Sequence, residues 1–257
     1  GAPDSSVGTV FLATGTVIGT GVVTRVFDRQ ITMNTGDSFL AMSSPAYVTS
    51  NRETTDGTTT KKPIGASRAT IFIDRTRTKI RELAYNLEVD GFATPDLTLI
   101  AEHITTGNVK ELAYTRSPDS LIWALLDTGQ LRCLTYERAQ DVVAWHRHTI
   151  GGNNSKVKSI AAIPSFDELQ EQLYMVVERT INGATKQYIE FLEKSFDQAK
   201  GDTPETAFFV DCGLSYSGIA VTSLSGLTHL EGETVKVLVN GANHPDKVVS
   251  SGAITLD

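Results

Sequence analysis

Residues 121–136 read LIWALLDTGQLRCLTY and indicate the fold class. Two apolar runs, Leu121–Asp127 and Leu131–Tyr136, flank a short polar segment. Their length and their content of Ile, Leu, Trp and Tyr are typical of buried β-strands. Gly129 can adopt the left-handed backbone conformation that closes a slightly longer hairpin. The stretch therefore predicts two antiparallel strands joined through Asp127-Thr128-Gly129.

Similar apolar runs, separated by turn residues, recur along the chain and predict an all-β protein. They include Ala69–Asp74, Leu173–Val177 and Tyr188–Leu192. Asn182-Gly183 and Asn240-Gly241 predict two-residue hairpins, because both central positions of a type I′ turn need positive φ. Helix signals are few. Thr94-Pro95-Asp96 resembles an N-cap followed by an N1 proline and predicts a helix over Leu97–His103. Phe166–Gln172 predicts another turn or two of helix.

An internal repeat organises these strands. Residues 79–85 and 130–136 share apolar and tyrosine positions at an offset of about 51 residues. A looser third copy follows, at 174–176 and 188–191. Segments that open two of the units also correspond, because 109–113 resembles 157–161. A period of about 50 residues that holds about four strands is the size of a β-propeller blade. The sequence favours propeller-like repeated antiparallel blades, with a sandwich or an open β-meander as alternatives.

This pattern divides the chain into a propeller-like β domain over residues 1–205 and a small β domain, complete or unfinished, over 206–257. The blade-like units lie near 67–106, 107–156 and 157–200. A composition shift near Lys200–Pro204 marks a linker, and Phe208–Cys212 after it predicts a strand. Short strands with glycine at most turns then predict a small β-barrel or half of one. These strands are Val235–Val239, Lys247–Val249 and Ala253–Leu256.

Composition and charge bound the possible functions. The net charge of −7 and the scattered Lys and Arg residues argue against a surface that grips DNA or a membrane, because such surfaces concentrate positive charge. No apolar stretch approaches the roughly 20 residues that span a bilayer, so we expect no membrane segment. Cys133 and Cys212 lie in apolar runs and are expected to be buried free thiols. We expect the chain to be an excerpt of a longer protein, because it starts without methionine.

The best candidate for a chemical site is Trp145-His146-Arg147-His148. On a strand, His146 and His148 point to the same face and could supply two metal ligands. A catalytic zinc needs a third protein ligand, and no suitably spaced partner is visible. The pattern therefore favours a solvated strand with Trp145 buried on the other face. We expect Trp123 and Trp145 to pack in the core rather than to form a sugar-binding platform.

Other signatures of catalysis are missing from the sequence. The segment Gly213–Ser217 approaches a nucleophile elbow, but the second glycine comes one place late. No phosphate-binding glycine loop, HExxH motif or EF-hand loop occurs. Acid pairs such as Glu168 with Glu171, or Asp90 with Asp96, are expected to solubilise the surface. The sequence therefore predicts a protein that is not an enzyme, with no catalytic, cofactor-binding or metal-binding residues.

Several segments carry a resemblance to known proteins. They are residues 121–131, 134–138, 143–148, 177–183 and 188–190, preceded by 80–82, 96–98 and 101–103. Over roughly residues 67–196, the chain resembles the bacteriophage tail proteins that include the tail tubular protein B, or nozzle, of short-tailed phages. Residues 225–235, 240–241 and 244–247 resemble the small β-barrel inserted in that family. This barrel is similar to the first catalytic-cysteine half-domain of ubiquitin-activating enzymes.

The resemblance implies a structural protein of the virion. Such a protein assembles as a homo-oligomeric ring beside other tail proteins, and DNA passes transiently and non-specifically through its lumen. The resemblance carries no catalytic residue with it. The mild acidity fits such a channel, because a lumen that bound phosphates tightly would retard DNA.

Two other classes of function stay open on the sequence. A β-propeller module that binds a host surface or a glycan is the first alternative, because propeller loops cluster at two faces. A glycan-degrading enzyme on the same scaffold is the second, and it requires convergent carboxylates in a pocket.

Overall fold

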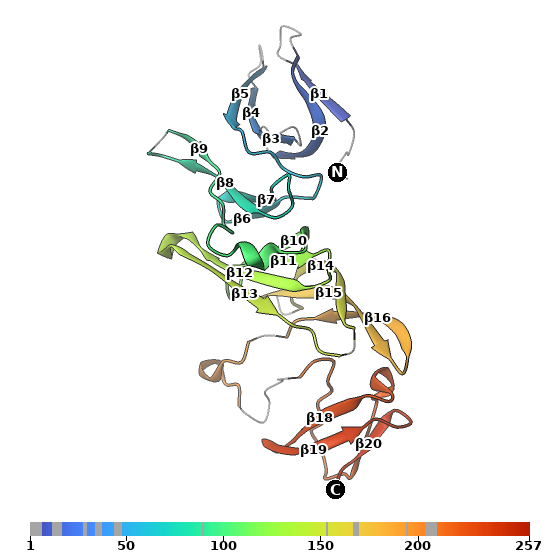
Figure 1. The fold of residues 1–257 in the computed structure, drawn as a ribbon. Coiled ribbons are helices and arrows are strands. Elements are labelled where there is room, and N and C mark those ends of the chain that lie inside the picture. Colours follow the sequence, from blue (N-terminus) through green and yellow to red (C-terminus); the bar gives the residue numbers. More distant parts are fainter. Residues whose placement is uncertain are drawn as a thin grey trace. The chain divides into compact units, whose positions relative to one another are not determined.

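The all-β prediction is confirmed by a computed structural model, in which the chain forms several small antiparallel sheets (Figure 1). The structure describes residues 7–11, 17–27, 30–33, 38–43, 48–88, 90–152, 154–166, 170–193, 195–203 and 210–257. Two compact units form, Gly1–His148 with Pro164–Glu171, and Thr149–Ile163 with Gln172–Asp257. The predicted boundary between residues 205 and 206 lies outside the described residues.

The first unit begins with a five-stranded antiparallel sheet in the order β1-β2-β3-β4-β5. Its strands are β1 (Val7–Phe11), β2 (Val17–Phe27), β3 (Gln30–Met33), β4 (Ser38–Ser43) and β5 (Val48–Thr54). Each strand pairs with its neighbours in the sequence, which is the arrangement that short connections favour.

Two four-stranded antiparallel sheets follow, again in chain order. The first contains β6 (Ile64–Ala66), β7 (Ala69–Ile73), β8 (Ile80–Asn86) and β9 (Gly91–Ala93). The second contains β10 (Val109–Thr115), β11 (Leu121–Leu126), β12 (Leu131–Glu137) and β13 (Val142–His148). The apolar runs within residues 121–136 thus form β11 and β12. Gly129 has a φ of 85° in the turn between them, as predicted.

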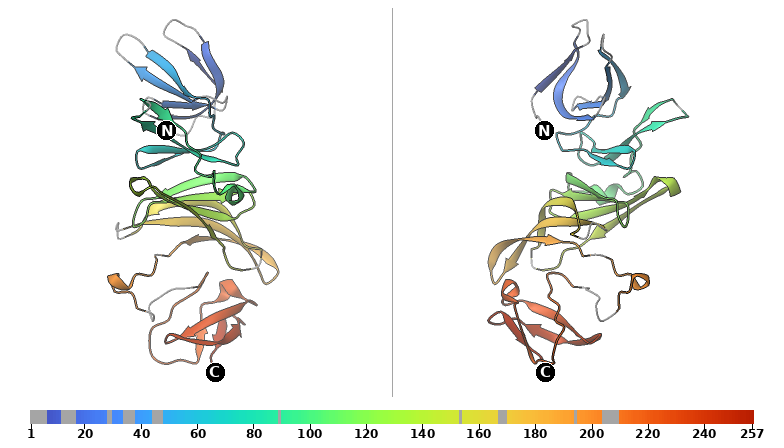
Figure 2. Two further views of the ribbon diagram at one scale, coloured as in Figure 1. Left: turned by 60° about the vertical axis from the view of Figure 1, so that its left-hand side comes forward. Right: turned by 180° about the vertical axis from the view of Figure 1, so that it is seen from behind.

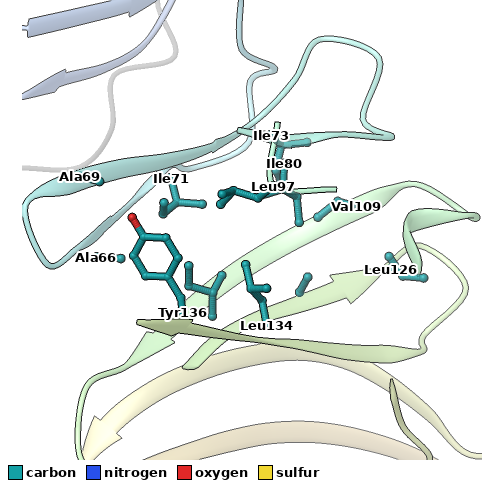
Figure 3. Close-up of a cluster of buried hydrophobic side chains, with 12 residues drawn as sticks. Ala66, Ala69, Ile71, Ile73, Ile80, Leu97, Val109, Leu126, Leu134 and Tyr136 are labelled. Atoms are coloured by element: carbon teal, nitrogen blue, oxygen red, sulfur yellow. The ribbon is translucent and has the colours of Figure 1, made fainter. Parts of the chain in front are cut away.

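The core of the first unit is made by these two four-stranded sheets together (Figure 3). All five residues of β7 are buried, and Leu134 and Tyr136 approach it from β12. Burial of one Ile or Leu side chain contributes about 1.5–3 kcal/mol, so this cluster is the main force that holds the two sheets together. Its members are Ala66, Ala69, Ile71, Ile73, Ile80, Leu97, Val109, Ile122, Ala124, Leu126, Leu134 and Tyr136.

The second unit holds most of a three-stranded sheet and two smaller strand pairs. The three-stranded sheet contains β14 (Lys156–Pro164), β15 (Glu171–Ile181) and β16 (Ala184–Phe191). The pairs are β17 (Ser223–Ser225) with β20 (Ala253–Thr255), and β18 (Thr234–Val239) with β19 (Ala242–Val248). Both views of Figure 2 show the β18–β19 hairpin. Leu227, Val237, Val249 and Ile254 form their shared core. The three strands predicted for the small barrel thus overlap β18, β19 and β20, and β17 is a further strand that the sequence did not predict.

Both predicted Asn-Gly hairpins are confirmed. Asn182 and Gly183 have φ values of 47° and 75° and join β15 to β16. Asn240 and Gly241 have φ values of 49° and 79° and join β18 to β19. The second hairpin makes β19 start at Ala242, earlier than the predicted strand over Lys247–Val249.

The internal repeat falls on equivalent strands of successive sheets. The first two copies form the third strand of each four-stranded sheet, β8 and β12, and the third copy covers parts of β15 and β16. Each of these sheets is open, and none closes on itself within the described residues.

The helix predicted over Leu97–His103 is wrong. The carboxylate of Asp96 accepts hydrogen bonds from the backbone amide and the hydroxyl of Thr98, and the amide of Leu97 donates to the carbonyl of Ile80. The bonds from Thr98 to Asp96 turn the chain locally, and the bond from Leu97 holds the segment against β8, so only the 3-10 helix η1 (Glu102–Thr105) forms. The other 3-10 helices of the described residues are η2 (Arg138–Gln140), η3 (Gln198–Lys200) and η4 (Thr228–Leu230). Part of the helix predicted over Phe166–Gln172 lies outside the described residues, and its last two residues begin β15.

The strand predicted over Phe208–Cys212 is also wrong in its described part. Cys212 lies in a bend with a φ of 54°, and its side chain is only partly buried. Cys133 is fully buried in β12, as expected, and both cysteines are free thiols.

Candidate functional site

The pairing of β12 with β13 gathers three potential metal ligands. Cys133 stands directly opposite His146 in the antiparallel register, and His148 follows His146 two positions along the same strand. Directly opposed residues have Cβ atoms about 4.5–5.5 Å apart, and residues two apart share one face of a strand. We call Cys133, His146 and His148 the Cys–His–His cluster.

The ligand atoms of this cluster lie close together. The Cys133 sulfur and one nitrogen from each imidazole are all within 4.8 Å of one another. Nε2 of His148 and Nδ1 of His146 are 2.9 Å apart, a hydrogen-bond distance. The ring of Trp123, on the neighbouring strand β11, lies 4.9 Å from the ring of His148. The two imidazoles are partly buried, so they form the more open side of a cluster whose sulfur is inaccessible.

Burial sets the protonation of these groups. It raises the pKa of the Cys133 thiol to about 12. It also lowers the pKa of His146, and burial followed by the nearby charge of His146 lowers the pKa of His148. Near neutral pH the cluster is therefore a thiol beside two neutral imidazoles, one of which donates its N–H to the lone pair of the other.

The opposite face of the same strands is apolar, as predicted. Trp145 packs against the core cluster, and its indole nitrogen donates to the carbonyl of Leu97 at 2.8 Å. Trp123 instead lies on the face of the cluster, because it pairs with Cys133 across β11 and β12 and its ring adjoins that of His148. Its indole nitrogen donates to the hydroxyl of Thr115 at 3.1 Å. Trp123 is fully buried, so this ring cannot serve as an exposed sugar-binding platform.

The acid pairs considered in the sequence have separate partners. Asp96 accepts from the ammonium of Lys79 at 2.9 Å, whereas Asp90 accepts from the hydroxyl of Tyr85. Glu171 accepts from the backbone amide of Arg116. Glu168 lies outside the described residues. Each of the three described carboxylates, Asp90, Asp96 and Glu171, therefore has its own hydrogen-bond partner.

The segment 213–217 lies outside any described helix or strand, so it does not form the strand-to-helix turn of a nucleophile elbow. A shallow pocket is lined by Thr78, Lys79, Glu102, His103 and Thr106. The ammonium of Lys79 is paired with Asp96 at 2.9 Å and lies 3.9 Å from Glu102.

Sequence reasoning found the two histidines and missed Cys133. The missing signal was register, because Cys133 and His146 become neighbours only once β12 pairs with β13. A prediction of the turn between β12 and β13 would have given their register and so revealed Cys133 as a neighbour of His146.

No protein-family model matches this chain, and no curated protein matches it. In the described part of the chain, no helix has the length and apolar character needed to cross a bilayer.

Proposed function

We propose that this chain is a structural component of a bacteriophage tail, of the tubular or nozzle type. In this proposal the chain belongs to the virion, forms a homo-oligomeric ring with other tail proteins beside it, and lines a passage for DNA. The resemblance that suggests this function spans roughly residues 67–196. Three successive sheets, β6–β9, β10–β13 and β14–β16, occupy nearly the same span.

The observation that carries the proposal is the match between repeat and sheet. Copies of the repeat lie on equivalent strands, β8 and β12, of two chain-ordered sheets, and a shared apolar core joins those sheets. A series of small sheets that bury their faces against one another is a scaffold. A propeller-like arrangement of these sheets as blades is part of the proposal.

Charge supports a passage for DNA. Basic side chains of the described residues are repeatedly paired with acids, as in Arg77–Asp127 at 2.6 Å, Lys236–Asp246 at 2.5 Å and Lys247–Asp257 at 2.5 Å. Paired cations bind phosphate weakly, and the chain as a whole carries a net charge of −7. DNA would therefore slide past without being held.

Immunogold labelling tests the proposal directly. Antibodies raised against the purified chain are applied to tailed particles from the source of this sequence and viewed in negative stain. We expect gold at the tail and none with pre-immune serum. Intact and disrupted particles that both stay unlabelled, while the antibody detects the chain in the infected-cell lysate, would overturn the proposal.

A glycan array distinguishes a tail scaffold from the main alternative, a module that binds a host surface or a glycan. A tail scaffold is expected to give no specific signal at micromolar concentration. Specific glycan binding by a chain that does not label tails would replace the scaffold with a host-surface binding module.

A further inference from the structure

We propose that the Cys–His–His cluster binds one divalent transition-metal ion, with Zn²⁺ as the preferred ion. Thiolate sulfur and imidazole nitrogen are the donors that Zn²⁺ selects, whereas Mg²⁺ and Ca²⁺ take oxygen ligands. The proposal stands on Cys133, His146 and His148 alone and does not depend on a role in a phage tail.

The spacing of the ligand atoms fits this ion. Zinc–sulfur bonds of about 2.3 Å and zinc–nitrogen bonds of about 2.0–2.1 Å place tetrahedral ligand atoms roughly 3.3–3.6 Å apart. The three ligand atoms lie within 4.8 Å of one another. The imidazole nitrogens, 2.9 Å apart, must separate by a few tenths of an ångström to admit the ion between them. Small rotations about the His χ angles provide this movement.

The backbone holds the ligands in place before the ion arrives. Cys133 and His146 are fixed by the ladder between β12 and β13, which extends from Leu131↔His148 to Glu137↔Val142. The indole of Trp123 restrains the ring of His148 from the third strand. Ligands on paired strands lose little freedom on binding, which favours affinity.

Binding exchanges one proton for the ion. The thiol of Cys133 releases its proton to solvent as the zinc–sulfur bond forms. The imidazole that donates the bond between His146 and His148 moves its proton to its other ring nitrogen through solvent, so that both rings offer a lone pair and neither changes its proton count. No oxidant or reductant takes part. Among the described residues no fourth Cys, His, Asp or Glu joins the group, so water completes the tetrahedron.

Titration of the purified full chain with ZnCl₂ tests the site. After removal of any affinity tag and treatment with a chelator, competition against a chromophoric zinc indicator should give one ion per chain. His146→Gln and His148→Gln should each weaken binding at least tenfold. His103→Gln, the same change at an exposed histidine outside the cluster, should leave it unchanged.

Cobalt provides a spectroscopic readout of the sulfur. Co²⁺ bound to the wild-type chain should show thiolate-to-cobalt charge-transfer absorption, and Cys133→Ala should abolish it. Because Cys133→Ala removes a buried group, circular dichroism must first show that the variant is folded, and the histidine variants carry the test if it is not. No zinc binding by the wild-type chain, or equal binding by folded His146→Gln, His148→Gln and His103→Gln, would overturn the proposal.

Discussion

Glu82 and Arg138 form an ion pair of 2.9 Å that joins β8 of one sheet to η2, which follows β12 of the next. The Glu82 side chain is fully buried, whereas 52% of the Arg138 side chain is exposed. Burial raises the pKa of Glu82, and the charge of Arg138 opposes that rise. The arginine therefore limits the cost of an ionised carboxylate in the core.

The raised pKa gives a pH dependence with a definite sign. Glu82 binds its proton more tightly when folded than when unfolded, so protonation stabilises the fold. This contribution is complete below the unfolded pKa of about 4.5 and is lost as pH rises through the higher folded pKa. Glu82→Gln should remove this part of the pH dependence.

Replacement of Arg138 should make the stability of the fold depend more strongly on the ionisation of Glu82. Arg138→Ala should lower the free energy of unfolding by about 1–2 kcal/mol at pH 8 and by much less at pH 4, where Glu82 is neutral. Urea denaturation at both pH values measures the difference. Arg68→Ala, at an exposed arginine, is the control. An equal loss at both pH values would show that the ion pair is not responsible.

The apolar cluster between the two four-stranded sheets should dominate the stability of the first unit. Leu134 is fully buried there, so Leu134→Ala should cost about 2–5 kcal/mol in the free energy of unfolding. Leu99 is 65% exposed, and Leu99→Ala should change it by about 0.5 kcal/mol or less. Guanidinium denaturation compares the two variants. Similar losses for both would contradict the assigned core.

Sequence predicted the features that local chemistry determines. The apolar runs gave β11 and β12, and the need for positive φ placed the turn at Asn182-Gly183. The helix predicted over Leu97–His103 failed because its competitor is not local. The carbonyl of Pro95 and the amide of Leu97 bond to residues of β8, which lies earlier in the chain, and no periodicity within the segment reveals that partner.

The candidate site shows the same limit. That His146 and His148 share a face follows from the two-residue period of a strand, and the sequence predicted it. That Cys133 joins them depends on the register between two strands, which the loop between Glu137 and Val142 determines. A search for metal ligands by their spacing along the sequence therefore finds His146 and His148 but not Cys133.

Two glycines with positive φ allow a matched test of backbone strain. Gly183 has a φ of +75°, and an added Cβ would meet nothing within 4 Å, so Gly183→Ala should cost about 1 kcal/mol from the backbone alone. Gly107 has a φ of +105°, and an added Cβ would lie 2.8 Å from Cγ2 of Thr128. Gly107→Ala should therefore cost about 2 kcal/mol or more. Thermal unfolding ranks the variants, and the reverse order would refute this assignment of strain.

Arg179 is the most deeply buried cation among the ion pairs of the described residues. Its side chain is 3% exposed, and its Nε and Nη2 atoms donate to the two carboxylate oxygens of Glu190 at 3.0 and 2.7 Å. Nη1 donates to the carbonyl of Gly151. The bidentate pair links β15 to β16, and the third bond ties both strands to the segment before β14.

Breaking this pair from one side should cost more than removing it. Glu190→Gln leaves the buried Arg179 charged and without its carboxylate partner, which should lower the free energy of unfolding by about 2–4 kcal/mol. The double variant Arg179→Met with Glu190→Met buries no charge and should recover at least half of that loss, because apolar side chains of similar length fill the space. Glu88→Gln, at an exposed carboxylate, should be neutral. Urea denaturation of the four proteins decides the point: a double variant less stable than Glu190→Gln would mean that the ion pair itself, and not the avoidance of an unpaired charge, stabilises the β15–β16 hairpin.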